Sequence, residues 1–196
     1  MDSDDATGYH GPAIPKPLGE QLQTVFATDE RPRRFGDVVD AVAGFVDRAG
    51  VDADLEALCT TDESPHRATF RGGTQHYLCT FDALIVPFIT DDVTTVDVET
   101  VSPIRERRVT FSVSADGIDA DPPDAVLSFG VASDAGDRST ADHGLVVAYR
   151  QICPHGKAFA SRAEYDEWAS TVDAHTTVVS MADALELARA LGRAVE

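Results

Sequence analysis

The spacing of apolar residues changes near Thr94, and this change limits the folds that the chain can adopt. Before it, residues 35–48 place apolar side chains three and four positions apart, the repeat that puts them on one face of an α-helix. After it, residues 96–101 and 109–113 largely alternate apolar and polar side chains, the repeat of a β-strand with one buried face. Helices followed by strands indicate an α+β protein, in which helices flank a mixed or antiparallel sheet.

The first part of the chain is predicted to be helical. Helical spacing recurs in three stretches, residues 18–27, 35–48 and 52–59. Gly50 is placed to end the second helix. Residues 1–17 are rich in Gly, Pro and Asp without periodicity and are expected to be a flexible leader. Residues 18–73 are therefore predicted to form an N-terminal helical region.

Residues 74–196 are predicted to form a catalytic domain around one core, because 196 residues are too few for two full-sized domains. Strands are expected at residues 66–73, 96–101, 109–113, 126–131, 145–152 and 176–179. Helices are expected at residues 162–171 and 182–194, and residues 76–89 are expected to run from a strand end into a buried helix. Residues 133–143 are dense in Asp, Gly, Ser and Thr, which predicts a surface loop.

The formal net charge of −18 argues against two kinds of partner. Such a charge repels nucleic acid and anionic membranes, because affinity for phosphate comes mainly from Lys and Arg. The basic cluster Arg31-Pro32-Arg33-Arg34 is the main feature in favour of DNA binding by the N-terminal helices, and that role is disfavoured. No apolar stretch approaches the roughly 20 residues that span a bilayer. We therefore expect neither a nucleic acid nor a membrane partner.

The chain start and the charge pattern predict a cytoplasmic protein of a high-salt cell. Residues 1–5 are acidic and lack the basic start and apolar middle of a secretory signal. Lysine occurs only at Lys16 and Lys157, whereas aspartate is spread along the chain. High ionic strength shortens the range over which these charges repel each other. The alternative is that the acidity serves solubility alone.

Three cysteines, Cys59, Cys79 and Cys153, make a disulfide framework improbable in a reducing compartment and favour free thiols, metal ligands or a nucleophile. Cys79 and Asp82 are spaced so that their side chains meet on one helix face, and the apolar neighbours Tyr77 and Phe81 predict that this face is buried. A buried carboxylate requires a partner or a function. The structural alternative is that Asp82 caps a helix or pairs with an Arg while Cys79 only fills space.

Cys153 is predicted to lie where an apolar strand ends in a Pro and Gly turn, a common position for functional groups. His155 and Lys157 are close enough in sequence to lower the pKa of its thiol. Cys59 has no acidic or His neighbour and is expected to be a core residue. Four other histidines have polar neighbours and are expected to be solvated: His10, His66, His143 and His175. His76 and His155 lie near the thiols in sequence.

Two segments resemble the organomercurial (alkylmercury) lyases. The run from Tyr77 to Pro87, in which Asp82 follows Cys79 by three and Leu and Pro come next, is similar to the first active-site segment of that family. Cys153-Pro154-His155 with the following Phe159-Ala160-Ser161 is similar to the second. The resemblance covers residues 75–196, and residues 18–73 would correspond to a shortened form of the family's winged-helix-like region. A further family cysteine is replaced near Ser102, which bears on stability more than on chemistry.

The resemblance implies an enzyme that cleaves carbon–mercury bonds by protonolysis to give a hydrocarbon and Hg(II). Cys79, assisted by Asp82, would capture the organomercurial, Cys153 would add to mercury, and Asp82 would deliver a proton to the leaving carbon. Mercury would then lie on Cys79 and Cys153, with Asp82 beside it, until an external low-molecular-weight thiol or a mercuric reductase removes it. No cofactor is required. Possible pocket residues are Tyr77, Phe81, His155 and Phe159.

Three other functions remain open. A zinc site made by Cys79, Cys153 and His155 lacks a Cys-x-x-Cys spacing. A cysteine hydrolase would need only one of the thiols and has no recognisable nucleophile motif. A non-enzymatic soft-metal carrier or redox sensor could use Cys79 and Cys153 alone, but it would not need Asp82.

Overall fold

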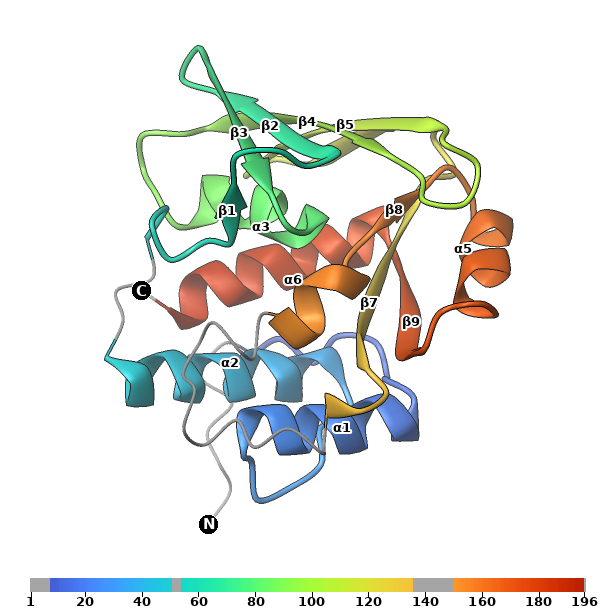
Figure 1. The fold of residues 1–196 in the computed structure, drawn as a ribbon. Coiled ribbons are helices and arrows are strands. Elements are labelled where there is room, and N and C mark those ends of the chain that lie inside the picture. The colour runs from blue at the N-terminus through green and yellow to red at the C-terminus, as the bar shows by residue number, and fades with distance from the viewer. Residues whose placement is uncertain (1–7, 51–53, 136–149, 196) are drawn as a thin grey trace.

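The computed structural model describes residues 8–50, 54–135 and 150–195 (Figure 1). It begins with two helices, α1 (Lys16–Phe26) and α2 (Phe35–Ala49), as the sequence predicted. The buried side of α1 carries Leu18 and Leu22. The carboxylate of Asp37 accepts hydrogen bonds from the backbone N–H groups of Arg33 and Arg34, at 2.6 and 3.0 Å, which fixes the start of α2. Gly50 ends α2 in the left-handed conformation, with φ of 62°.

The segment before α1 lies against the start of α2, and residues 1–7 of the predicted leader lie outside the described residues. The N–H of Phe35 donates to the Pro12 carbonyl at 3.0 Å, and that of Gly36 donates to the His10 carbonyl at 3.0 Å. A side chain at Gly36 would lie 2.2 Å from the carbonyl oxygen of Tyr9, so this close approach requires glycine. Residues 10–12 of the predicted leader thus contact the start of α2.

The helix predicted for residues 52–59 is absent over residues 54–58, which form turns. The carboxylate of Asp54 accepts hydrogen bonds from the N–H groups of Glu56 and Ala57, and this local bonding competes with a helix. Three short strands follow, β1 (Thr60–Thr61), β2 (His66–Phe70) and β3 (Gly73–Tyr77). The expected boundary at residue 73 thus falls inside a hairpin, and the region of residues 18–73 contributes strands as well as helices.

A six-stranded antiparallel sheet is completed by β4 (Thr95–Val101), β5 (Arg108–Ser114) and β6 (Ile118–Asp121), in the order β1-β3-β2-β4-β5-β6. The alternation that predicted β4 and β5 is seen in their burial: Val96, Val98, Val109 and Phe111 face the core. No strand was predicted from the sequence at residues 118–121, where β6 lies.

A second antiparallel sheet has β7 (Val126–Ala132) between β8 (Ala158–Phe159) and β9 (Ala174–Ser180). The predicted strands at residues 126–131 and 176–179 are confirmed. The strand predicted at residues 145–152 is wrong at its end, because residues 150–152 are helical and lead into a 3-10 turn, η3 (Cys153–His155). Pro154, with its fixed φ, favours the first turn of such a helix. Residues 136–149, which include most of the predicted loop, lie outside the described residues.

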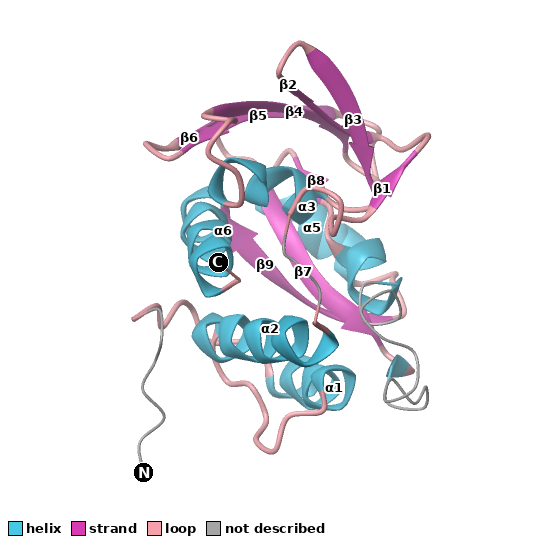
Figure 2. Ribbon diagram, turned by 90° about the vertical axis from the view of Figure 1, so that its left-hand side faces the viewer, coloured by secondary structure: helices cyan, strands magenta, loops and turns pink. Residues whose placement is uncertain are grey.

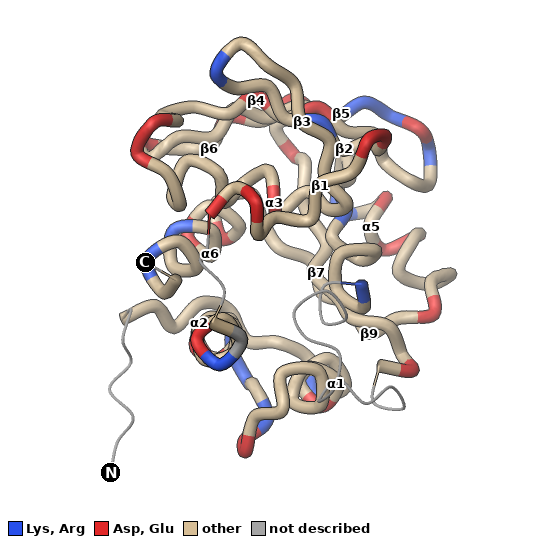
Figure 3. The backbone as a smooth tube through the Cα atoms, turned by 60° about the vertical axis from the view of Figure 1, so that its left-hand side comes forward, with Lys and Arg blue, Asp and Glu red and all other residues tan. Residues whose placement is uncertain are grey.

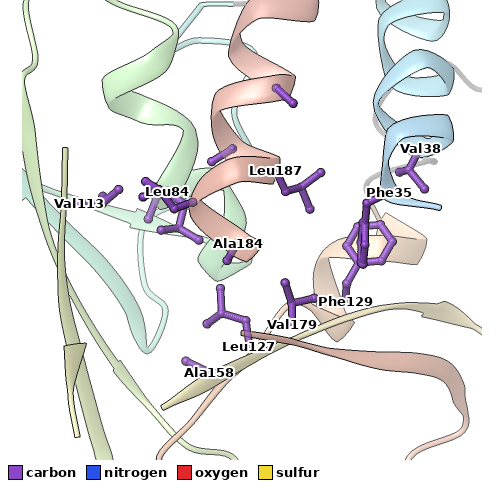
Figure 4. Packing of buried hydrophobic residues seen from close by; sticks show 14 of the residues in the cluster. Phe35, Val38, Leu84, Val113, Leu127, Phe129, Ala158, Val179, Ala184 and Leu187 are labelled. Carbon is purple, nitrogen blue, oxygen red and sulfur yellow. The ribbon is translucent and has the colours of Figure 1, made fainter. Parts of the chain in front are cut away.

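The described ranges also contain the helical elements α3 (Thr80–Ile85), η1 (Val86–Phe88), α5 (Arg162–Ala169) and α6 (Met181–Ala194). Figures 1 and 2 show α6 between the six-stranded sheet and α2. Leu84 of α3, Leu187 of α6, and Leu127 and Phe129 of β7 meet in the core (Figure 4). The α+β class is confirmed. None of the helices in the described ranges is long and apolar enough to cross a bilayer.

Candidate active site

Cys79 and Asp82 lie where β3 passes into α3. Cys79 is the N-cap residue of α3, with an extended backbone, and Asp82 is in the first helical turn. Cys79 Sγ donates a hydrogen bond to Asp82 Oδ2 at 3.3 Å. The three-residue spacing suggested that Cys79 lies inside a helix, but it lies just before one. The two side chains still meet, because the N-cap side chain points towards the first turn. Both residues are buried.

Cys153 comes to the same carboxylate from η3. Its Sγ lies 4.0 Å from Asp82 Oδ2, and its side chain is buried. The two segments are joined at Thr80, whose N–H and Oγ1 both donate to the carbonyl of Gly156, at 3.1 and 2.9 Å. Tertiary structure therefore brings together Cys79, Asp82 and Cys153, the three residues that the sequence singled out.

All three groups are weaker acids here than in water, and for Asp82 the cause is burial. It raises the pKa of Asp82 to about 6, against the opposing effect of hydrogen bonds from the Cys79 thiol and the Cys59 N–H. A hydrogen bond with Cys153 lowers the pKa of Cys79, but burial and the charge of Asp82 outweigh it, so the pKa is raised. The pKa of Cys153 is raised mainly by hydrogen bonds with Cys59 and Cys79 and, to a smaller extent, by burial. At neutral pH the resting site therefore holds protonated thiols beside an ionised carboxylate.

His155 and Lys157 do not produce the expected activation of Cys153. The pKa of His155 is lowered by burial and by Lys157, so its imidazole is neutral. Burial also lowers the pKa of Lys157, although Cys79 and Cys153 oppose this shift.

His66, expected to be solvated, is buried. Its Nε2 lies 3.1 Å from Lys157 Nζ, and its Nδ1 lies 2.6 Å from Thr100 Oγ1. Burial and Lys157 lower the pKa of His66 to about 3, so its imidazole is neutral. Lys157 thus has a neutral imidazole as its neighbour. His76 contacts Ser64 through its Nδ1, which lies 2.9 Å from the Ser64 carbonyl oxygen.

A cavity of about 120 Å³ opens beside the thiols and Asp82. Its apolar lining comes mainly from α2, α3, β7 and α6: Val38, Val42, Val46, Phe81, Ile85, Phe129, Leu187 and Leu191. Of the four expected pocket residues, Phe81 contributes to this wall. Tyr77 is buried in the core, and Phe159 packs against Tyr165 and Trp168, with ring centroids 5.7 and 5.2 Å away. Among the described residues, Tyr77, Phe159 and His155 do not line the cavity.

Cys59 was predicted from the sequence to be a core residue, but it lies at the site. Its Sγ, a carboxylate oxygen of Asp82 and Cys153 Sγ all lie within 4.8 Å of one another. The zinc site considered from the sequence consisted of Cys79, Cys153 and His155. In the structure, the residues close enough to share a metal ion are Cys59, Asp82 and Cys153. No local signal could have identified Cys59, because the pairing of β1 with β3 brings it to the site.

Comparison with known proteins identifies the family. A sequence model of the alkylmercury lyases matches residues 59–192, which is more than half of the chain. A search of curated proteins found no match. The fold is similar to that of a solved structure, the mercury-bound form of MerB2, with a TM-score of 0.52 over 93% of each chain and 12% sequence identity. The match includes all three cysteines and Asp82, and the chain therefore belongs to the alkylmercury lyase family of enzymes.

Proposed function

We propose that this enzyme cleaves the carbon–mercury bond of organomercurials by protonolysis, with Cys79, Asp82 and Cys153 as the reacting groups. The observation that carries the proposal is the convergence of two thiols on one carboxylate oxygen, Asp82 Oδ2, at 3.3 and 4.0 Å. Hg(II) is a soft ion that prefers thiolate to oxygen or nitrogen ligands, so two cysteines suit this substrate. A carboxylate between them can move a proton.

In the first step, Cys79 binds the R–Hg⁺ species and loses its proton, assisted by Asp82. A sulfur–mercury bond forms, and this first proton passes to solvent. The raised pKa of Cys79 does not prevent capture, because metal binding itself displaces the thiol proton.

In the second step, the Cys153 thiol gives its proton to Asp82 and its sulfur adds to mercury. The added sulfur raises electron density on the carbon, and Asp82 protonates that carbon as the carbon–mercury bond breaks. The products are RH and Hg(II) held by two sulfurs, and Asp82 is again ionised. The pKa of Asp82, raised to about 6, suits a group that must first accept and then donate a proton near neutrality.

The cavity is suited to the organic part of the substrate. Its lining of aliphatic and aromatic side chains accommodates an uncharged alkyl or aryl group and excludes water from the leaving carbon. Phe81 and Phe129 contact each other edge to face, with ring centroids 5.8 Å apart, and form part of this wall. The reaction requires no cofactor, and a low-molecular-weight thiol or a mercuric reductase would receive the Hg(II).

The test is benzene release from phenylmercury in the presence of excess small thiol. We expect Cys79→Ser, Cys153→Ser and Asp82→Ala each to lower the rate by at least about a hundredfold, because each removes a reacting group. Asp116→Ala, which removes an exposed carboxylate, is the matched control and keeps the rate. Mercury binding without benzene release would instead identify a soft-metal carrier or sensor, and full activity of Asp82→Ala would exclude Asp82 as the proton donor.

A further inference from the structure

Cys59 places a third thiol at a site for which two are sufficient. Its sulfur lies within 4.8 Å of both Cys153 Sγ and a carboxylate oxygen of Asp82. A third sulfur thus lies beside the carboxylate on which the other two thiols converge.

Strand pairing holds Cys59 in this position. Thr60 of β1 is opposite Tyr77 of β3, and the N–H of Leu78 donates to the carbonyl of Cys59 at 2.9 Å. Cys59 therefore lies opposite Leu78, the residue that precedes Cys79. The neighbouring Leu58 lines the cavity.

The three thiols differ in exposure. Cys79 and Cys153 are 4% and 2% exposed, whereas Cys59 is only partly buried. Cys59 is thus on the side of the cluster that solvent and an acceptor thiol can reach. A residue with a purely structural role at this place would not require a sulfur atom.

We propose that Cys59 is a third sulfur ligand of the Hg(II) product, an inference that rests on the proposed function. After RH has left, mercury is bound by the sulfurs of Cys79 and Cys153. Cys59 then forms a third sulfur–mercury bond, and its thiol proton is released to solvent. The complete reaction converts R–Hg⁺ and three thiols into RH, a three-coordinate mercury thiolate and two protons.

A third thiolate is chemically favoured over the competing ligand, the carboxylate of Asp82. Mercury is soft and binds sulfur in preference to carboxylate oxygen. Because Cys59 is the least buried of the three cysteine residues, an external thiol would approach the cluster from its side. Cys59 therefore retains the product until an acceptor arrives and then lies on the route by which mercury leaves.

The experiment loads the full chain with one equivalent of Hg(II) chloride and counts sulfur neighbours by mercury X-ray absorption. We expect three sulfurs in the wild type and two in Cys59→Ser and Cys59→Ala. Thr60→Ser, at the adjacent residue, is the matched control and keeps three. In unbuffered solution, loading the wild type should release one proton more per mercury than loading Cys59→Ser.

Two sulfurs in the wild type, or three in both Cys59 variants, would overturn the proposal. Circular dichroism of the two variants separates loss of a ligand from loss of the fold. Because loading with Hg(II) requires no bond cleavage, this result is independent of the benzene assay. Failure of the third ligand can thus be distinguished from failure of the lyase mechanism.

Discussion

Asp82 combines a functional role with a cost to stability. Burial raises its pKa from 3.8 to about 6, so the folded state binds the proton more tightly than the unfolded chain does. The stability that this group contributes is present below pH 3.8 and is lost as the pH rises through about 6. At pH 8 the ionised, buried carboxylate destabilises the protein by roughly 2 to 3 kcal/mol, since each pKa unit corresponds to about 1.4 kcal/mol.

Asp82→Asn should therefore be more stable than the wild type at pH 8, with a difference that disappears as the pH falls towards 4. The amide keeps the size of the side chain and an oxygen that can accept the hydrogen bonds, but it carries no charge. Thermal unfolding of both proteins between pH 4 and 8 is the measurement, with Asp116→Asn as an exposed control. A stability difference that grows as the pH falls would contradict the assignment of a raised pKa to Asp82.

At the scale of elements, the site depends on contact between the start of α3 and the turn after η3. An added Cβ at Gly156 would lie 3.0 Å from Cys79 Cβ and 3.6 Å from Cys79 Sγ. Gly156 has a φ of −90°, so alanine can adopt its backbone conformation and the conflict is steric. The two segments are therefore in contact with no spare room.

Gly156→Ala should displace Cys79 by a few tenths of an ångström and lower the rate of benzene release about tenfold, because small displacements of reacting groups are costly. The melting temperature should change little. Gly117→Ala is the matched control, because a Cβ at Gly117 would meet no atom within 4 Å. Equal rates in the two variants would show that the position of Cys79 tolerates this contact.

The turn between β4 and β5 contains a buried hydroxyl. Ser102 is fully buried, and its Oγ has no hydrogen-bond partner among the described residues. An unpaired buried hydroxyl costs about 1 to 3 kcal/mol.

Ser102→Ala should accordingly raise the free energy of unfolding by about 1 kcal/mol, because it removes an unsatisfied polar group. Thr100→Val should lower it, because Thr100 Oγ1 lies within hydrogen-bond distance of His66. Urea titration of the two variants and the wild type measures both changes. Destabilisation by both substitutions would mean that Ser102 has a partner after all.

At the scale of the whole molecule, the acidic charge is spread over the surface. Figure 3 shows Asp and Glu on both the sheet layer and the helical layer. On the outer face of the six-stranded sheet, Asp97 and Asp119 flank Ser112 in adjacent strands. The net charge of −18 predicts strong repulsion between surface charges at low ionic strength.

The melting temperature should therefore rise by several degrees between 0.1 and 2 M KCl, because the Debye length falls from about 10 Å at 0.1 M to about 3 Å at 1 M. The double variant Asp119→Asn, Asp121→Asn removes two exposed charges from the edge strand β6 and should show a smaller rise. Scanning calorimetry at several KCl concentrations is the measurement. A melting temperature independent of KCl would mean that the acidity serves solubility alone.

The sequence by itself determined the α+β class and most helices and strands, and it singled out Cys79, Asp82 and Cys153, which the fold brings together. Periodicity depends on residues close together in the chain, and it correctly predicted α2, β4, β5 and α6. The pair Cys79 and Asp82 could be recognised for the same reason, since both belong to one short segment. Cys153 was recognised through its own segment, although the strand predicted to precede it was wrong.

Only the tertiary structure decided which walls enclose the cavity and that Cys59 joins the cluster. Val42 of α2 and Leu187 of α6 line the same space, although they are distant in sequence. Cys59 reaches Asp82 and Cys153 because β1 pairs with β3, and strand pairing between separate segments leaves no trace in local spacing. Local hydrogen bonds around Asp54 likewise replaced a predicted helix by the turns that precede Cys59. Contacts between remote segments, which local periodicity cannot encode, therefore completed the site.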